Sequence, residues 1–390
     1  RDPLPCQSVY IQGRSCAWRG REKDMELNRR HLLKSMMAAA PVIGAAQTEP
    51  KKLGIPGPFP GRVIAVNHAG SAVSGKHQPE PVRDMVARGM MELTSAPSAT
   101  DAWRYFFEPG DVVGIKVNPV GQPFLISSPL VMHAIIAGLE SAGVKKTDIF
   151  AYDRYRAEFL SGGFDKWLPD GVRWEAATQR SVDGLQLDME GYDQDVYMEM
   201  ALLARRADPT NPHHRRSYVA KFLTQRVNKV LTLGVVKHHQ SAGATIALKN
   251  ISHGFVNNVA RSHVSSSNNA CGMFIPTVVD LPVFRKKVVL HIIDGVMAAY
   301  HGGPSRKVGR YLWEHKTMYF ATDPVAVDTV GLSVIDLKRG QMGMEPIAAA
   351  KPDQDSLFVR MQPEFIEISG LLGLGVGDES KIDLRKINLA

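Results

Sequence analysis

The sequence is short of cysteine and of membrane-length apolar runs, and both shortages exclude classes of protein. Three of the 390 residues are cysteines: Cys6, Cys16 and Cys271. This number is too small for a disulfide framework and falls below the roughly four thiolates of an iron–sulfur cluster. We therefore expect no iron–sulfur cluster, and we expect any divalent metal to be bound by histidine and carboxylate side chains.

The sequence also lacks the motifs of several other functional classes. The formal net charge is +8, yet no stretch interleaves basic with aromatic residues, so we expect no nucleic-acid partner. No Gly-x-Ser-x-Gly motif is present, which argues against a serine hydrolase. The glycine-rich residues 373–378 do not lie within a strand–helix–strand unit and do not fit a dinucleotide-binding motif.

The segment from residue 25 to 46 has the pattern of an export signal. Arg29 and Arg30 precede an apolar stretch, residues 36–46, that is shorter than the roughly 17–25 residues of a membrane-spanning helix. This stretch lacks the polar positions of an amphipathic helix, which disfavours a buried N-terminal helix. The pattern predicts a twin-arginine signal peptide, with residues 1–24 as upstream, non-native sequence. We expect the twin-arginine export machinery as a partner, a location in the periplasm or cell envelope, and no stable membrane span after cleavage.

Beyond a Pro/Gly-rich linker, residues 47–61, short apolar runs alternate with helix-sized segments. The expected strands are Arg62–Val66, Val112–Val117, Ile149–Tyr152, Lys229–Val236, Val288–Ile293 and Met318–Ala321. The expected helices include Val82–Leu93, Pro129–Ala142 and Val325–Leu337. This order predicts an α/β domain over residues 62–378, with a largely parallel or mixed sheet and helices on both faces. Polar residues 155–225 interrupt the alternation and predict an insertion or subdomain, and with it two lobes, before a C-terminal tail at 379–390.

Polar residues follow every expected strand. In an open α/β sheet, ligands bind beyond the carboxyl ends of the strands, so we expect these residues to line one cleft. They are His68, Lys116, Asn118, Asp153, His238, His239, Asp294 and Asp323. Each also has an ordinary structural role, such as a helix N-cap for an aspartate before a proline.

The stretch from Lys237 to Gly254 carries the densest chemistry. A strand that ends in two histidines, a turn of small residues and a helix with Lys249 and Asn250 can surround an anion. We expect Lys249 and either His238 or His239 to be catalytic, and Asn250 to bind the ligand. Lys249 lies among apolar residues, so its ammonium either binds an anion or cofactor, or forms a salt bridge with a carboxylate such as Asp294 or Asp323.

Two further features can complete the site. His253, with His263 after it, can ligate a divalent metal together with Asp294 and Asp323, although no standard zinc spacing is present. Gly302 and Gly303 can turn backbone N–H groups toward an anion, and the alternative there is a flexible surface loop. Cys271 is expected to be a small structural residue.

The order of these motifs resembles the DUF362 family. The resemblance spans residues 62–377 and rests on six features in order: Lys116-Val117-Asn118-Pro119, Ser128-Pro129, Asp153, Lys237 to Asn250, Asp294-Gly295 with Gly303-Pro304, and Thr322 to Asp328. It implies the α/β fold but no particular activity. Many members of that family carry ferredoxin-type cysteine motifs, which this chain lacks.

A second, local resemblance is to the lactate racemase family, through His238-His239, the small-residue turn and Lys249. It implies a nickel-pincer nucleotide held by Lys249, with His239 or His238 moving protons on a hydroxy acid. Three hypotheses follow. The chain is an exported enzyme or cofactor-dependent protein for a small anionic ligand, a nickel-pincer racemase or epimerase, or a non-catalytic ligand-binding protein of the envelope.

Replacing both Arg29 and Arg30 by lysine should abolish export, because the twin-arginine route reads the paired arginines. The measurement is fractionation of cells that express the wild-type or the variant chain, with sequencing of the mature N-terminus, which we expect near Gln47. Normal export of the variant, or a mature N-terminus at residue 1, would contradict the signal hypothesis.

Overall fold

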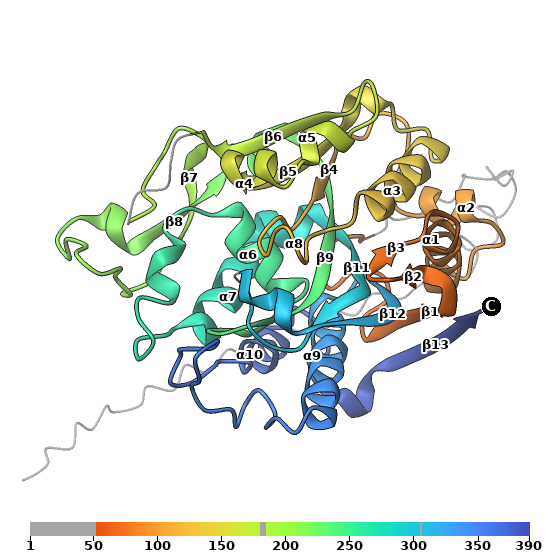
Figure 1. Ribbon diagram of the computed structural model, residues 1–390. Helices are drawn as coiled ribbons and strands as arrows, with labels where there is room; N and C mark the ends of the chain where they lie inside the picture. The colour runs from red at the N-terminus through yellow and green to blue at the C-terminus, as the bar shows by residue number, and fades with distance from the viewer. Residues whose placement is uncertain (1–51, 180–184, 305) are drawn as a thin grey trace, which may run out of the picture. The chain divides into compact units, whose positions relative to one another are not determined.

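A mixed β-sheet forms the centre of the structure, a computed structural model that describes residues 52–179, 185–304 and 306–390 (Figure 1). In this described part the sheet has nine strands, in the order β13-β1-β12-β11-β9-β4-β5-β6, with β10 paired to β9. The strands are β1 (Arg62–His68), β4 (Val113–Lys116), β5 (Ile149–Tyr155), β6 (Arg173–Thr178), β9 (Lys229–His239), β10 (Gly243–Thr245), β11 (Val288–Ala299), β12 (Leu312–Ala321) and β13 (Asp383–Leu389). The expected signal peptide, 25–46, and the segment before it lie outside the described residues.

Helices cover both faces of the sheet, as the sequence predicted. Neighbouring residues of a strand point to opposite faces. Accordingly, Val63 and Ala65 of β1 pack in a core with α9, whereas Ile64 and Val66 pack in a core with α1, α2 and α3. The helices are α1 (Pro79–Thr94), α2 (Ala99–Arg104), α3 (Pro129–Ser141), α4 (Arg156–Ser161), α5 (Phe164–Trp167), α6 (Leu248–Phe255), α7 (Cys271–Val279), α8 (Pro282–Lys287), α9 (Pro324–Gln341) and α10 (Phe365–Leu371).

All six predicted strands are present, but they do not all end at one edge. The strands β11, β9, β4, β5 and β6 run parallel to one another, and β12 runs antiparallel to both of its neighbours, β11 and β1. The strand β1 therefore points the same way as β11. Five of the predicted strands end at a common edge, and β12 ends at the opposite one. The expectation that all six strand ends line one cleft is wrong for β12.

The segment expected to be an insertion is partly built into the sheet. Its strand β6 pairs in parallel with β5 after α4 and α5, so this part is another strand–helix–strand unit. The remainder forms a separate antiparallel pair, β7 (Tyr192–Glu199) with β8 (Arg216–Ala220). A third small pair joins β2 (Ala72–Val73) to β3 (Lys76–His77). The expected tail contains β13, which pairs in parallel with β1.

The described domain is not divided into the two lobes that we expected. By its internal contacts, Lys51–Ala390 forms one unit, because β6 extends the same sheet instead of starting a new core. None of the helices in the described residues has the length and apolar character to cross a membrane.

His291 is a buried polar residue in the middle of β11. Its side chain is fully buried, and neither ring nitrogen has a hydrogen-bond partner among the described residues. Burial lowers the pKa of His291 from 6.5 to about 3. The folded protein therefore holds this imidazole neutral at pH values where the unfolded chain protonates it.

Replacing His291 by leucine should make the protein less sensitive to acid. Between pH 6.5 and 3 the unfolded chain binds more protons at this position than the folded chain, so the free energy of unfolding falls as the pH falls. From pH 7 to 5 this one group accounts for about 2 kcal/mol, and the variant should lack that loss. The measurement is urea unfolding at both pH values.

The same substitution at the exposed His133 is the control and should leave the pH dependence close to that of the wild type. If His291→Leu retains the full loss of stability between pH 7 and 5, the histidine is not held neutral in the fold.

Candidate functional site

A cavity of about 190 Å³ opens at the edge where β4, β5 and β9 end. It lies where the parallel strands meet helix α6, the position at which α/β sheets commonly bind ligands. The residues that line it are mostly polar. They are Lys116, Asn118, Val120, Asp153, Arg154, Tyr155, Glu158, Gln186, Lys237, His239, Thr245, Lys249, Asn250, His253, Gly254, Val259, His263 and Pro304.

Lys116 and Asp153 form a buried ion pair at the ends of β4 and β5. The Lys116 Nζ lies 2.6 Å from Asp153 Oδ1 and also donates to Val117 O at 2.5 Å and to Asn250 Oδ1 at 3.2 Å. Burial lowers the pKa of Lys116, and the charge of Asp153 opposes this effect. The lysine stem lies against Gly254 of α6, where a Cβ atom would come within 2.0 Å of Lys116 Cε. A glycine is therefore required there for the present position of the lysine.

Lys237 of β9 reaches the same cavity from the neighbouring strand. Its ammonium donates to Asn118 Oδ1 at 3.1 Å and to Val120 O. Burial, reinforced by the charge of Lys249, lowers the pKa of Lys237 to about 7. Lys237 is thus held by neutral oxygens and not by a carboxylate.

Helix α6 carries Lys249, Asn250 and His253, and its N-terminus is held by a side chain of α9. Its residues provide no side-chain cap, but Asp328 of α9 accepts from Ala247 N at 2.7 Å and from Leu248 N at 3.2 Å. An acceptor at the first turn satisfies N–H groups that otherwise have no partner. The position of α6 therefore depends on α9.

Lys249 differs from the other two lysines because no described residue pairs with its ammonium. The side chain is 8% exposed and lines the cavity. The salt bridge to Asp294 or Asp323 that the sequence left open is absent from the ion pairs of the described residues. Burial lowers the pKa of Lys249 to about 8, and the nearby Arg154 and Lys116 lower it further, against the opposing effects of Cys271 and Glu158.

His239 presents one defined tautomer to the cavity. Its Nδ1 accepts from the backbone N–H groups of Ser241 at 3.2 Å and Ala242 at 3.3 Å. A neutral imidazole with Nδ1 as acceptor carries its proton on Nε2. Burial and the charge of Lys249 hold the pKa of His239 well below its usual value. His239 is consequently a neutral N–H donor at Nε2.

Three buried polar atoms at the cavity have no hydrogen-bond partner among the described residues. They are Glu158 Oε2, Thr245 Oγ1 and Asn250 Nδ2. Burial, together with the nearby charge of Asp153, raises the pKa of Glu158 to about 7. Buried polar groups are nearly always hydrogen-bonded in folded proteins, so these atoms are available to a ligand.

His253, His263 and Cys271 form a group beside the cavity that can hold a metal ion. Each residue offers one ligand atom, and these atoms lie within 4.8 Å of one another. Burial and the charge of Lys249 lower the pKa of His253 well below 6.5 and that of His263 to about 3. The third donor is a thiol, so the expectation that a metal would have only histidine and carboxylate ligands is wrong for this group.

Residues 113–333 match the family described as "Domain of unknown function (DUF362)". The chain belongs to the DUF362 family. The DUF362 region is shorter than the span of 62–377 suggested by the sequence, but it contains all the described residues that line the cavity. No curated protein shows significant similarity to the chain.

Within the DUF362 region the cavity unites seven of the predicted site residues and leaves others apart. Those at the cavity are Lys116, Asn118, Asp153, His239, Lys249, Asn250 and His253. His68, which precedes the DUF362 region, instead accepts from Gly70 N at 3.0 Å and caps a short 3-10 helix. The predicted polar ends of β4, β5 and β9 therefore meet at this cavity, whereas His68, at the end of β1, does not reach it.

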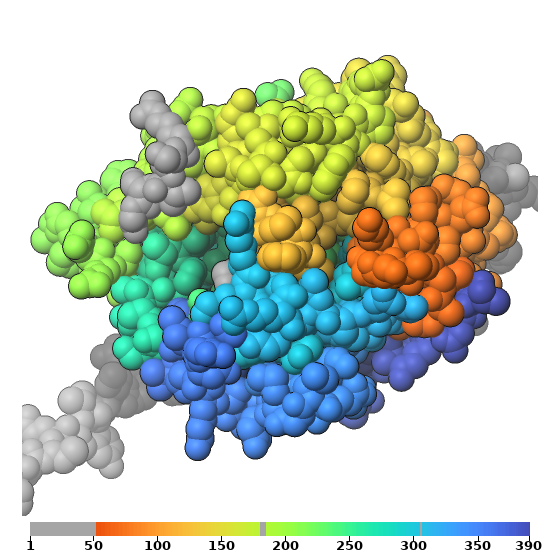
Figure 2. Space-filling model, in the orientation of Figure 1, coloured from red at the N-terminus to blue at the C-terminus, as the bar shows by residue number. Residues whose placement is uncertain are grey.

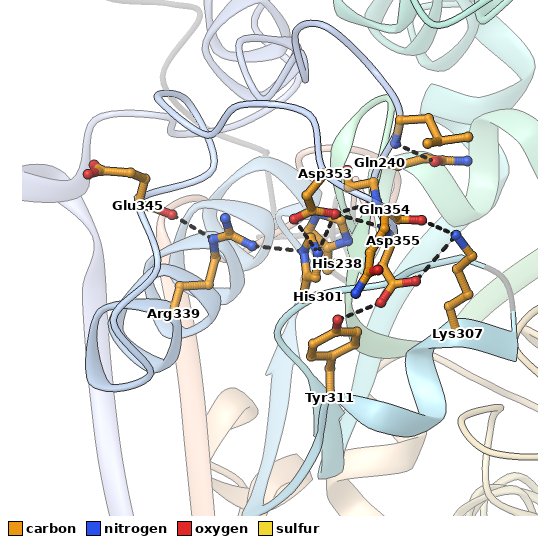
Figure 3. Close-up of polar contacts among 12 residues, drawn as sticks. His238, Gln240, His301, Lys307, Tyr311, Arg339, Glu345, Asp353, Gln354 and Asp355 are labelled. Atoms are coloured by element: carbon orange, nitrogen blue, oxygen red, sulfur yellow. Dashed lines mark hydrogen bonds and ion pairs between the residues drawn. The ribbon is translucent and has the colours of Figure 1, made fainter.

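His238 lies in a different cluster, because successive residues of β9 point to opposite faces. Its Nδ1 accepts from Gly303 N at 3.2 Å, and its ring centroid lies 4.9 Å from that of His301. Figure 3 shows His301 between Arg339 and Asp353 in this cluster. Gly302 and Gly303 belong to the same region and do not line the cavity, and a Cβ at Gly303 would lie 1.8 Å from His238 O. The predicted roles of His238 and the two glycines are not supported by their positions.

The two predicted metal-binding aspartates also have other partners. Asp294 lies 2.9 Å from His77 Nε2 of β3. Figure 2 shows the orange N-terminal segment, which contains β3, beside cyan residues of the part of the chain that contains β11. Burial acts to lower the pKa of His77, but Asp294 outweighs this effect and raises it. Asp323 is at the opposite edge of the sheet and accepts from four backbone N–H groups, those of Gly61, Val325, Ala326 and Val376. Because β12 is antiparallel, Asp323 cannot join the metal group with His253.

Four polar residues that line the cavity were not predicted as site residues from the sequence: Arg154, Glu158, Lys237 and Thr245. Lys237 directly precedes the two histidines and alternates with His238, so the period of two in a strand could have placed it with His239. Glu158 lies on α4, in a segment taken for an insertion, and no local pattern marks it. Its role depends on burial next to Asp153, which only the fold reveals.

Proposed function

We propose that this protein binds a small anion, a carboxylate or phosphate compound, in the cavity and transfers a proton to or from it. The observation that carries this proposal is Lys249. A buried ammonium without a counter-ion costs several kcal/mol, and no described residue pairs with this one. An anionic ligand would supply the missing charge.

The balance of charge in the cavity supports an anion. Lys116, Lys237, Lys249 and Arg154 line it, against the carboxylates Asp153 and Glu158. Asp153 is already paired with Lys116, and near pH 7 both Glu158 and Lys237, each with a pKa of about 7, are partly neutral. Arg154 and Lys249 remain as cations without a carboxylate partner among the described residues. The field of the lining therefore favours negative charge.

The neutral donors fit the oxygens of such a ligand. His239 offers Nε2–H, and Asn250 Nδ2 and the Thr245 hydroxyl have no other described partner. A buried amide donor without an acceptor is costly, so a ligand oxygen would stabilise the site. A carboxylate or phosphate group has enough oxygens to accept from several of these donors and from Lys249 together.

Glu158 suits the acid–base role better than either histidine. His238 is in another cluster, and the Nδ1 of His239 is already an acceptor for two backbone N–H groups. A general acid or base works best with a pKa near the working pH. Glu158, with its pKa near 7 and one oxygen without a described partner, meets this condition.

A nickel-pincer racemase or epimerase is the second candidate, and one observation favours it. Lys249 has an amine without a described partner in a cavity that also contains imidazoles, and in that hypothesis a lysine holds the cofactor covalently. Intact-mass spectrometry of protein from its native host would reveal such an adduct. We also propose export by the twin-arginine route, supported by the sequence of residues 25–46.

Lys249→Met should weaken the binding of small anions at least tenfold, because it removes the charge and keeps the stem. The measurement is isothermal titration calorimetry with sulfate and lactate as probes. Because Lys249 is protonated below its pKa of about 8, affinity for sulfate should be present at pH 7 and decline as the pH rises through 8. Tenfold corresponds to about 1.4 kcal/mol.

Lys351→Met removes an exposed lysine that does not line the cavity, and it should leave both affinities unchanged. The opposite result would be a Lys249→Met protein with wild-type affinities and lowered stability, which assigns Lys249 a structural role. Failure of the wild type to bind either probe would also count against the proposal.

Glu158→Gln tests proton transfer separately from binding. With pyruvate in D₂O, we expect the wild type to exchange the C3 methyl protons for deuterium, because Glu158 takes up the proton while the keto oxygen receives the electron pair as an enolate. The variant should exchange at least 100-fold more slowly, since the amide cannot take up the proton. Proton NMR measures the exchange, and calorimetry checks that pyruvate affinity stays within about threefold. A wild type that binds pyruvate without exchange would be a binding protein for this compound.

A further inference from the structure

We propose that His253, His263 and Cys271 form a binding site for one divalent transition-metal ion of the zinc class. His253 lies in the last turn of α6, His263 follows the 3-10 helix η5 (Val259–Ser262), and Cys271 begins α7. Their ligand atoms lie within 4.8 Å of one another. The site is distinct from the anion-binding proposal, because neither Lys249 nor Glu158 is a ligand.

The three donors share one neighbour, the hydroxyl of Ser262, which a metal ion bound between them would displace. Ser262 Oγ lies 3.0 Å from His253 Nε2, 2.6 Å from His263 Nδ1 and 3.9 Å from Cys271 Sγ. In a tetrahedral zinc site, bonds of about 2.0–2.3 Å separate the ligand atoms by about 3.3–3.7 Å. From the observed limit of 4.8 Å, the side chains would have to close by about 1.1–1.5 Å to reach this geometry.

The surroundings of His253 match those of a metal ligand. Its other ring nitrogen, Nδ1, lies 3.1 Å from Ser252 Oγ, and that hydroxyl can donate to Lys249 O at 3.3 Å. Ser252 can then accept the Nδ1 proton of His253, which leaves the Nε2 lone pair for a metal ion in place of its present contact with Ser262 Oγ. Such a partner on the second nitrogen is usual for metal-binding histidines.

The donor types select the ion. Two imidazoles and a thiolate suit zinc, cobalt and related ions, whereas magnesium and calcium require oxygen ligands. Three protein ligands leave a fourth position, the arrangement of catalytic zinc sites. His253 and His263 line the cavity, so we infer that the fourth position opens toward it and accepts water or an oxygen of an anion.

The test is titration of metal-free, full-length protein with Co²⁺, without any added anion. We expect one Co²⁺ per chain and the near-ultraviolet charge-transfer band of a cobalt–thiolate bond, and we expect Zn²⁺ to displace the cobalt. Cys271→Ser should lose the band and bind Co²⁺ at least tenfold more weakly. His263→Gln, at a partly exposed position, should also bind at least tenfold more weakly.

Cys6→Ser combined with Cys16→Ser is the matched control and should retain the band and the affinity. Circular dichroism establishes that each variant is folded. The proposal is overturned if the wild type binds no Co²⁺, if the band survives in Cys271→Ser, or if it disappears in the control. Sulfate binding by the metal-free protein is measured separately, so the failure of either proposal can be recognised on its own.

Discussion

The cavity depends on the buried ion pair between Lys116 and Asp153. It joins the ends of β4 and β5, and Lys116 extends the connection to Asn250 of α6. Asn250 Oδ1 also accepts from Asn118 Nδ2, and Asn118 Oδ1 accepts from Lys237. One series of hydrogen bonds thus connects three strand ends and a helix. Removing one partner of a buried pair leaves an uncompensated charge, at a cost of about 3–5 kcal/mol. The Lys116–Asp153 pair therefore stabilises the fold as well as lining the cavity.

The same series explains why Lys249 stands apart. Lys116 and Lys237 have their ammonium groups held by oxygens of the protein, and these oxygens are then no longer available to a third lysine. Lys249 is enclosed with them, and the repulsion among these like charges lowers the pKa of Lys237 as well as that of Lys249. Its pKa of about 8 expresses that repulsion together with burial. An anion would bind at Lys249, because the nearby oxygen acceptors of the protein are already hydrogen-bonded to Lys116 and Lys237.

The sequence was sufficient to predict the sheet and seven of the residues that line the cavity. Runs such as Val288–Ile293 are apolar on both faces and have no good alternative to a covered strand, and the residues after parallel strands meet by topology. Strand direction was harder, because nothing local indicates that β12 returns antiparallel, and Asp323 was misplaced as a result. The alternation that separates His238 from His239 is a local property and could have been applied.

The sequence suggested His253 and His263 as metal ligands, but Cys271 as the third donor of this group lay beyond such reasoning. His253, His263 and Cys271 come from two helices and a loop, at spacings that match no standard motif, so their proximity is a result of how α6 and α7 pack. Glu158 is similar, since its raised pKa arises from burial beside Asp153 and not from its neighbours in the sequence. Local patterns predict which elements form, whereas chemistry between elements depends on the completed packing.

The capping of α6 by Asp328 makes the site depend on a distant part of the chain. The helix has eight residues, and its N-terminus is satisfied from α9, some 80 positions later in the chain. So short a helix is marginal by itself in water. The positions of Lys249, Asn250 and His253 therefore depend on the packing of α9 against α6. Occupancy of the cavity and global stability are thermodynamically linked, and a bound ligand would act as a marker that the chain has finished folding.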